Sequence, residues 1–248
     1  MRVIYYLWLR QLTRFTRSKS RIIGSVGQPL LFLLALGYGL GSVYKKAGDG
    51  NYLQFLVPGI MVQTALFAAM FFGAMIIFDR QFGFLKETMV APVSRLKIML
   101  GGALGGATTA TMQGALVLFI SFFLGFRPYN WAMVPIAVLI LFYLAVAIAC
   151  FSSGIGSVVQ DMQGFQAINQ FLVFPLYFLS GALYPLDNVP TWLRIVAEVN
   201  PISYSVDAMR WALINQTKFG ITRDLIVMTI TLIVCVVFGA QRFRRIEA

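Results

Sequence analysis

Residues 132–158 read AMVPIAVLILFYLAVAIACFSSGIGSV and contain no charged side chain. The run exceeds the roughly 20 apolar residues that an α-helix needs to cross the hydrocarbon core of a bilayer. Its apolar residues are continuous and do not alternate over about ten residues, which is typical of a membrane helix and not of a barrel strand. The run therefore predicts an all-α membrane protein.

Further apolar runs of this kind extend over the rest of the chain. The protein has 248 residues, of which 59% are hydrophobic and 12% are charged, whereas a typical soluble domain has about 25% charged residues. We therefore expect a single polytopic transmembrane domain over residues 1–248, with six membrane-spanning helices. Their expected positions are 22–43, 55–78, 98–125, 132–158, 165–184 and 222–241.

The distribution of basic residues predicts the topology. Thirteen of the 20 Lys and Arg lie before the first expected span, in the loop 79–97 or after the last span. Because Lys and Arg are enriched on the cytoplasmic side of membranes, we expect these segments and both termini in the cytoplasm. The basic residues alternate with blocks long enough to cross a bilayer, so the net charge of +11 indicates a multi-pass membrane protein and no binding of nucleic acid. We expect this protein in the plasma membrane of a prokaryote.

The first twenty residues form an amphipathic pattern. At helical spacing, apolar residues that include Trp8 gather on one face, and Arg10, Arg14 and Arg17 fall on the opposite one. We predict an interface helix over 1–20 that lies on membrane lipids, with Trp8 at headgroup depth. The alternative is a simple basic flank of the first span, which would need the arginines but not their segregation.

The segment 185–221 between the last two expected spans predicts two short helices. Pro190 can open a helix that runs to Glu198, the pair Asn200-Pro201 breaks it, and Ser203 can cap a second helix to about Leu213. Both are too short to span a membrane and carry large apolar side chains. We expect a re-entrant hairpin at the outer interface, with an ordinary external loop as the alternative.

The loop 79–97 interrupts the apolar sequence with charge. Its residues 82–89 can form about two helical turns, in which Phe84, Leu85 and Met89 supply an apolar edge while Lys86 and Glu87 stay polar. We expect the membrane surface or the groove of a partner protein to cover that edge. A loop that only enforces topology would need basic residues, but neither Glu87 nor an apolar edge.

Several patterns bear on chemistry. The chain has no His, its two cysteines lie in apolar runs, and it has no G-x-x-x-x-G-K-[ST] phosphate loop, so we predict neither an enzyme nor a metal site. An ion-driven secondary transporter would need charged residues within the spans, which hold almost none. Glycines spaced as G-x-x-x-G at 101–106 predict close helix packing, within the chain or across a dimer.

Two segments resemble those of ABC-2 type transporter permeases, the membrane subunits of exporters that include daunorubicin-resistance-like drug pumps. These are DRQFGFLKETMVAPVSRLKIMLGGALGG at 79–106 and LSGALYPLDNVPTWLRIVAEVNPISYSVDAMR at 179–210. The resemblance implies the ABC-2 (type V exporter) permease fold. It also implies a permease homodimer with two copies of a separate ABC ATPase subunit, which binds ATP and Mg, so that this chain holds no cofactor itself.

The resemblance also assigns roles to residues. It implies an ATPase-coupling helix at Gly83, Phe84, Leu85, Lys86, Glu87, Thr88 and Pro92, and an external hairpin with Asn200, Pro201, Tyr204, Asp207 and Arg210. The expected cargo is a hydrophobic or amphipathic compound, such as a drug, a lipid or a lipid-linked glycan, or alternatively a polysaccharide or glycolipid polymer. Aromatic residues of the spans could line its path, and the candidates are Phe71, Phe171, Phe174 and Tyr177.

Overall fold

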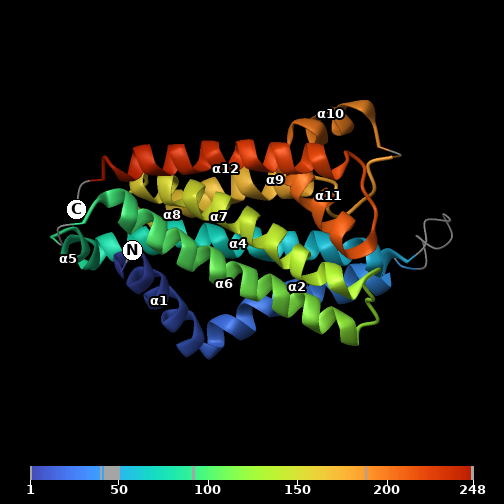
Figure 1. The fold of residues 1–248 in the computed structure, drawn as a ribbon, viewed down its shortest axis with the longest axis horizontal. Coiled ribbons are helices and arrows are strands. Elements are labelled where there is room, and N and C mark those ends of the chain that lie inside the picture. Colours follow the sequence, from blue (N-terminus) through green and yellow to red (C-terminus); the bar gives the residue numbers. More distant parts are fainter. Residues whose placement is uncertain (1, 40, 42–50, 91–92, 188, 247–248) are drawn as a thin grey trace.

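The computed structural model describes all residues except 1, 40, 42–50, 91–92, 188 and 247–248, and it contains helices but no strand among the residues that it describes. Helices are expected because a backbone in hydrocarbon has no water to bond, and a helix satisfies its own amides and carbonyls. The apolar runs of the sequence therefore become a bundle of helices (Figure 1).

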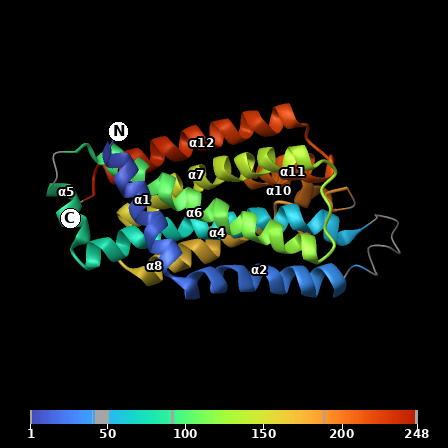
Figure 2. The same cartoon turned by 60° about the horizontal axis from the view of Figure 1, so that its bottom comes forward.

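Four helices are long and apolar enough to cross a membrane: α4 (Tyr52–Gln81), α6 (Arg95–Phe123), α7 (Val134–Val158, preceded by the short turn η1, Trp131–Met133) and α12 (Ile221–Phe243). They run side by side, and both chain termini lie at the end of the bundle that also carries the short helix α5 (Phe84–Val90) (Figures 1 and 2). We call this end the terminal end. The opposite end, with α10 (Thr191–Val199) and part of α11 (Pro201–Ile214), is called the hairpin end.

One of the six expected spans is shorter than predicted. Helix α2 (Lys19–Gly39) has 21 residues, whereas the expected fifth span is a chain of α8 (Met162–Ile168), a π-helical turn η2 (Asn169–Val173) and α9 (Phe174–Phe178), which together cover 17 residues. Seventeen residues of helix extend about 25 Å, less than the roughly 30 Å of a hydrocarbon core. By length and composition, four of the described helices are candidate spans, and the count of six stays a prediction.

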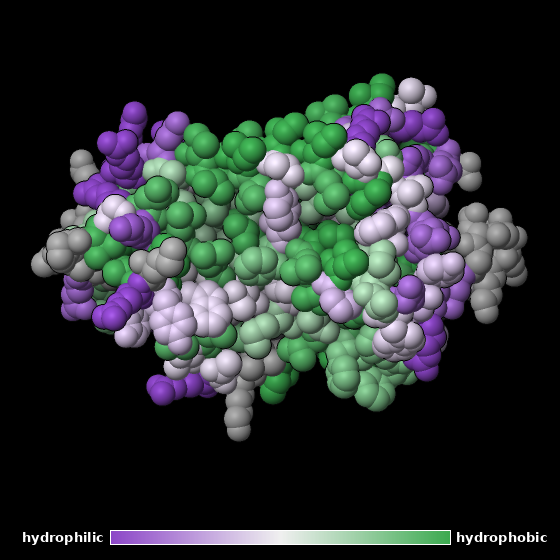
Figure 3. All heavy atoms as spheres, in the orientation of Figure 1, coloured by the Kyte–Doolittle hydropathy of each residue, from purple (hydrophilic) through white to green (hydrophobic). Residues whose placement is uncertain are grey.

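The surface of the molecule has the distribution of polarity that a membrane protein needs. An apolar band covers the middle of the bundle, and hydrophilic residues gather at both ends (Figure 3). Helix α12 contributes exposed side chains such as Ile226, Ile230 and Ile233 to this band. The fold is therefore that of an all-helical membrane protein, with its polar ends separated by an apolar middle.

Small residues set the distances between the long helices. A Cβ atom on Gly156 of α7 would lie 2.4 Å from the carbonyl oxygen of Gly73 in α4. Nearby, the Ser152 hydroxyl accepts a hydrogen bond from the Gly73 amide at 2.8 Å and donates one to the Met70 carbonyl at 2.5 Å. In lipid, the hydrophobic effect does not drive helices together. Close packing of small residues and buried hydrogen bonds from hydroxyl groups stabilise helix pairs instead.

The helix boundaries differ from expectation mainly at the loop 79–97. Helix α4 continues to Gln81 and α6 begins at Arg95, so the charged residues Asp79, Arg80 and Arg95 belong to helix ends. The expected end of the first span at 43 lies outside the described residues.

Candidate functional site

Helix α1 (Arg2–Arg17) is fixed to the end of α4 by two ion pairs, which we call the Asp79 clasp. Arg10 Nη2 lies 2.6 Å from Asp79 Oδ2, and Arg14 Nη1 lies 3.3 Å from Asp79 Oδ1. All three side chains are partly buried, which limits screening by water. Arg17, the third arginine of the expected basic face, is exposed.

The opposite side of α1 packs on α6. The indole Nε1 of Trp8 donates a hydrogen bond to Thr108 Oγ1 at 2.9 Å, and a Cβ on Gly105 would lie 2.6 Å from the Cβ of Gln11. The glycine spacing at 101–106 therefore serves packing within the chain, one of the two uses that the sequence allowed. The indole of Trp8 is thus bonded to a neighbouring helix, and its expected position at headgroup depth stays a prediction.

Arg80 points away from the clasp and holds the end of α7. Its guanidinium donates to the carbonyls of Gly156 and Ser157 at 2.9 Å and to that of Val159 at 3.2 Å. These carbonyls lie at a helix C-terminus, where the partial negative charge of the helix dipole favours a cation. Adjacent residues of α4 thus attach α1 and α7 to the same point of the bundle.

Helix α5 follows after a turn at Gly83, whose φ of +77° favours glycine. Leu85 is buried in the bundle, and Met89 packs against the same core. Phe82 and Phe84 are 71% and 47% exposed. The expectation that Leu85 and Met89 need a partner to cover them was therefore wrong, because the chain itself covers them.

The other expected coupling residues fall into two groups. Glu87 lies in the first turn of α5 and is exposed. Pro92 lies outside the described residues, as do the side chains of Lys86 and Thr88. Leu85, Arg10 and Asp79 line one small cavity of about 40 Å³, so α5 and the Asp79 clasp are neighbours.

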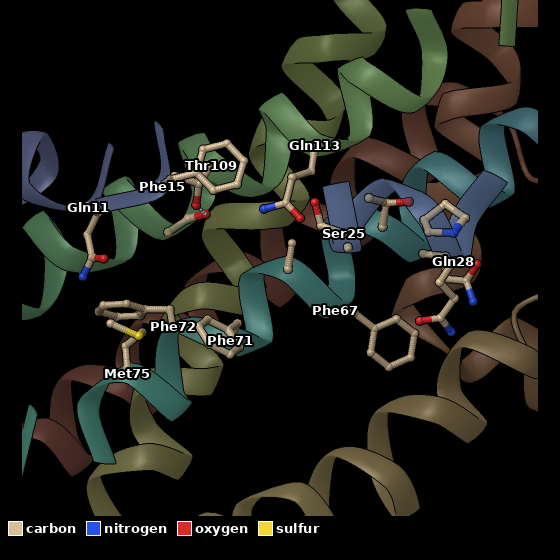
Figure 4. A pocket seen from close by; sticks show the side chains of 16 residues that line it. Gln11, Phe15, Ser25, Gln28, Phe67, Phe71, Phe72, Met75, Thr109 and Gln113 are labelled. Carbon is tan, nitrogen blue, oxygen red and sulfur yellow. Dashed lines mark hydrogen bonds between the residues drawn. The ribbon is translucent and has the colours of Figure 1, made fainter. Parts of the chain in front are cut away.

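A larger cavity of about 390 Å³ lies between α1, α2, α4 and α6. Figure 4 shows polar side chains of α2 and α6, among them Ser25 and Gln113, across from the aromatic side chains Phe67, Phe71 and Phe72 of α4. We call it the glutamine cavity, after the four glutamines among its lining residues: Gln11, Gln28, Gln63 and Gln113. No local pattern of residues predicts this cavity, because its lining residues come from four separate segments.

The four aromatic residues expected to line a substrate path do not come together. Phe71 lines the glutamine cavity, and the ring of Phe174 lies 5.8 Å from that of Phe67, another lining residue. Phe171 is 83% exposed, whereas Tyr177 is completely buried. The structure thus places two of the four at or beside this cavity and two elsewhere.

The expected hairpin residues hold the start of α11 in place. Asn200 caps the helix by accepting a hydrogen bond from the amide of Ile202 at 3.0 Å, and it donates one to the Leu176 carbonyl at 2.5 Å. Pro201 is the first helical residue, and the hydroxyl of Tyr204 donates to the carbonyl of Glu198 at 2.6 Å. The prediction that Ser203 is the cap was wrong, since Asn200 precedes it with a better placed acceptor.

Asp207 and Arg210 connect α11 to its surroundings. Asp207 accepts hydrogen bonds from the amides of Lys218 and Phe219 at 2.8–2.9 Å and from the hydroxyl of Thr217 at 2.9 Å. Arg210 donates to the carbonyls of 181 and 182 and lies 3.7 Å above the ring of Phe55. Helix α11 is buried on nearly all sides, unlike the surface helix that its amphipathic neighbour α10 forms.

Sequence reasoning missed one buried acid. Asp224 lies in the first turn of α12 and is completely inaccessible to solvent. Neither of its carboxylate oxygens has a hydrogen-bond partner among the described residues. No periodicity signalled this, because Asp is also the residue expected in the first turn of an exposed helix.

Comparison with known proteins identifies the family. The model of the ABC-2 type transporter family matches residues 2–214, which include every helix from α1 to α11. The chain belongs to the ABC-2 type transporter family. Daunorubicin resistance ABC transporter permease protein DrrB1 of Streptomyces coeruleorubidus is 24% identical over 206 residues, which cover 83% of this permease and 72% of DrrB1.

Other relatives of this ABC-2 permease come from Cyanophora paradoxa and Rhizobium leguminosarum. The ycf38 protein of Cyanophora paradoxa is 29% identical over 253 residues, covering 97% of this permease and 86% of that protein. Nodulation protein J of Rhizobium leguminosarum bv. trifolii is 25% identical over 242 residues, covering 96% of this permease and 92% of nodulation protein J. The resemblance read from residues 79–106 and 179–210 is thereby confirmed.

Proposed function

We propose that this chain is the permease subunit of an ATP-driven exporter and that a separate ABC ATPase, in two copies, powers a permease homodimer. The observation that carries the proposal is the family match over 2–214, together with a relative whose name is that of an ABC transporter permease. ATP and Mg belong to the ATPase, so the permease contributes the membrane path and the surface that receives the motion.

Helix α5 is the surface that we assign to the ATPase. Phe82, Phe84 and Glu87 are exposed at the terminal end, while Leu85 holds the helix to the bundle. A partner groove would cover the exposed aromatic rings, which is the usual mode of recognition of a short helix. A push on α5 would reach α4 and α1 through the Asp79 clasp, which shares a small cavity with Leu85.

The terminal end is assigned to the cytoplasm. The basic residues concentrated there support this orientation by the positive-inside rule, and the relatives from Streptomyces and Rhizobium support the plasma membrane of a prokaryote. We count α2 and the segment 162–178 as spans as well, which gives six crossings with both termini inside. Helices α10 and α11 then form the re-entrant hairpin at the outer side.

The cargo that we propose is a hydrophobic or amphipathic compound, taken from the cytoplasm or the inner leaflet. A drug, a lipid and a lipid-linked glycan all fit this class. The relatives are named for daunorubicin resistance and for nodulation, so the family membership is compatible with more than one cargo.

The test is stimulation of ATP hydrolysis in a reconstituted complex. The permease is incorporated into vesicles with the ATPase encoded beside it, and hydrolysis is measured with and without the permease. We expect stimulation by the unchanged permease and its loss in Glu87→Arg, because reversed charge on α5 would oppose docking. Glu198→Arg is the matched control, since Glu198 is an exposed glutamate at the hairpin end.

The outcomes separate the parts of the proposal. Stimulation that persists in Glu87→Arg would remove α5 from the coupling surface. Absence of stimulation by the unchanged permease, together with transport driven by an ion gradient alone, would replace the ATP-driven exporter with a secondary transporter.

A further inference from the structure

The glutamine cavity is built from residues far apart in the sequence. Helix α4 supplies Gln63, Thr64, Phe67, Phe71 and Phe72, and the remaining walls come from α1, α2 and α6. Its volume of about 390 Å³ lies within the range of small-molecule sites. Phe71 is 41% exposed, so the cavity can be reached from the surface of the bundle.

One polar atom in the wall requires a partner. Gln63 is 3% exposed, and its side-chain oxygen Oε1 has no hydrogen-bond partner among the described residues. Leaving a buried acceptor unsatisfied is unfavourable, because the acceptor has lost its hydrogen bonds to water. The unsatisfied oxygen of Gln63 is explained if a bound molecule in the cavity donates a hydrogen bond to it.

The other polar residues of the wall extend this pattern. Gln113 lies on α6, one turn from Thr109, and Figure 4 shows both with Ser25 around the same space. The hydroxyls of Thr64 and Thr109 donate to carbonyls of their own helices, at 2.8 Å each, which leaves their oxygens as acceptors toward the cavity. The wall therefore offers several hydrogen-bond acceptors and amide donors within a small volume.

The described lining residues include no charged side chain. A charged ligand group moved into such a place would lose its hydration and gain no counter-charge from the described wall, which is unfavourable. An uncharged group with several hydroxyls can instead bond to amides and hydroxyls without that cost. The four phenylalanines and Met75 supply apolar contact for a hydrocarbon part of the ligand.

We propose that the glutamine cavity binds an amphiphile whose head group is uncharged and rich in hydroxyl groups, with the head on Gln63 and Gln113 and the apolar part on the phenylalanines of α4. The proposal deepens the proposed function, on which its biological role rests, by stating the class of cargo that the cavity selects. A single-chain amphiphile and a two-chain membrane glycolipid share this chemistry, and the experiment distinguishes them.

The experiment uses the full-length permease in phosphatidylcholine vesicles, without the ATPase. The probe is dodecyl maltoside with a photoactivatable diazirine in its chain, and crosslinked residues are mapped by mass spectrometry. We expect saturable labelling in 63–75 and 106–113. Unlabelled dodecyl maltoside should displace the probe, whereas dodecyltrimethylammonium and dodecyl sulfate, with the same chain and a charged head, should not.

Variants test the role of the amides. Gln63→Leu and Gln113→Leu keep the approximate volume of the side chain and should each weaken probe binding about tenfold, the effect of one lost buried hydrogen bond. Gln170→Leu is the matched control, because Gln170 is exposed and lies outside the cavity wall. Two cavity variants are used so that misfolding of one leaves the other informative.

Each outcome has a defined meaning. Displacement of the probe by a diacylglycerol glucoside added to the vesicles would support the proposal with a membrane lipid as the source, and displacement only by single-chain maltosides would support it with a free amphiphile. Labelling spread evenly over α12 and the cavity segments, equal displacement by charged competitors, or unchanged affinity in both cavity variants would overturn it. Loss of ATPase stimulation with intact probe binding would contradict only the proposed function.

Discussion

The two ends of the bundle each carry a short helix, and the two helices are held in different ways. At the hairpin end, α11 is buried along most of its length, and Asn200, Asp207 and Arg210 bond it to neighbouring segments. At the terminal end, α5 has seven residues, of which Leu85 is buried while its neighbour Phe84 is exposed, as is Phe82 in the turn before the helix.

The difference shows which end is suited to motion. A helix that is buried and hydrogen-bonded on several sides opens only with much of the surrounding structure, whereas a short helix with few buried contacts can move at low cost. Asn200, Asp207 and Arg210 bond α11 to neighbouring segments, whereas the exposed face of α5 is accessible to another molecule. We therefore expect substitutions at the hairpin end to change stability and substitutions on the exposed face of α5 to change coupling.

The largest effect is expected for Arg210→Ala. This change leaves the carbonyls of Gly181 and Ala182 without their donor and removes a cation from above Phe55, so the free energy of unfolding should fall by about 3 kcal/mol. The matched control is Arg194→Ala, which removes an exposed arginine that also donates to a carbonyl at the same end. Denaturant unfolding in detergent micelles measures both, and equal losses would contradict the rigid hairpin end.

A second pair compares neighbouring residues of α5. Leu85→Ala removes the buried contact of the helix and should lower the free energy of local opening by about 2 kcal/mol. Phe84→Ala should leave local opening within about 0.5 kcal/mol, because this ring is half exposed. Hydrogen exchange of the α5 amides measures both changes. If Phe84→Ala opened the helix as much as Leu85→Ala did, the division of α5 into an inner and an outer side would be incorrect.

The smallest effect is expected for the Asp79 clasp. A double-mutant cycle with Arg10→Ala and Asp79→Ala should give a coupling energy of about 0.5–1 kcal/mol, since the pair is only partly buried and is weakened by salt. The same cycle with the exposed Arg17 in place of Arg10 should give a value near zero. A coupling energy for Arg10 that does not fall as salt is added would show that packing, and not charge, joins α1 to α4.

Much of the fold could be predicted because a bilayer permits few structures. Apolar runs of membrane-spanning length, glycines at a spacing of four and the Asn200-Pro201 break each have one strong physical meaning, and the helices that they predict are present. The π-turn at Asn169–Val173 was not predicted. Composition averaged over a window does not register a local change in helix type.

The sequence by itself determined that this chain is an all-helical membrane protein and, through residues 79–106 and 179–210, the family to which it belongs, because covalent order and hydropathy are enough to specify these properties. Only the tertiary structure decided that Trp8 faces Thr108, that Asp79 binds two arginines of α1 and that Gln63 lines a cavity with no charged side chain among its described lining residues. Each of these facts depends on residues dozens of positions apart in the chain. These contacts depend on how the helices pack against one another, and no local pattern of residues predicts them.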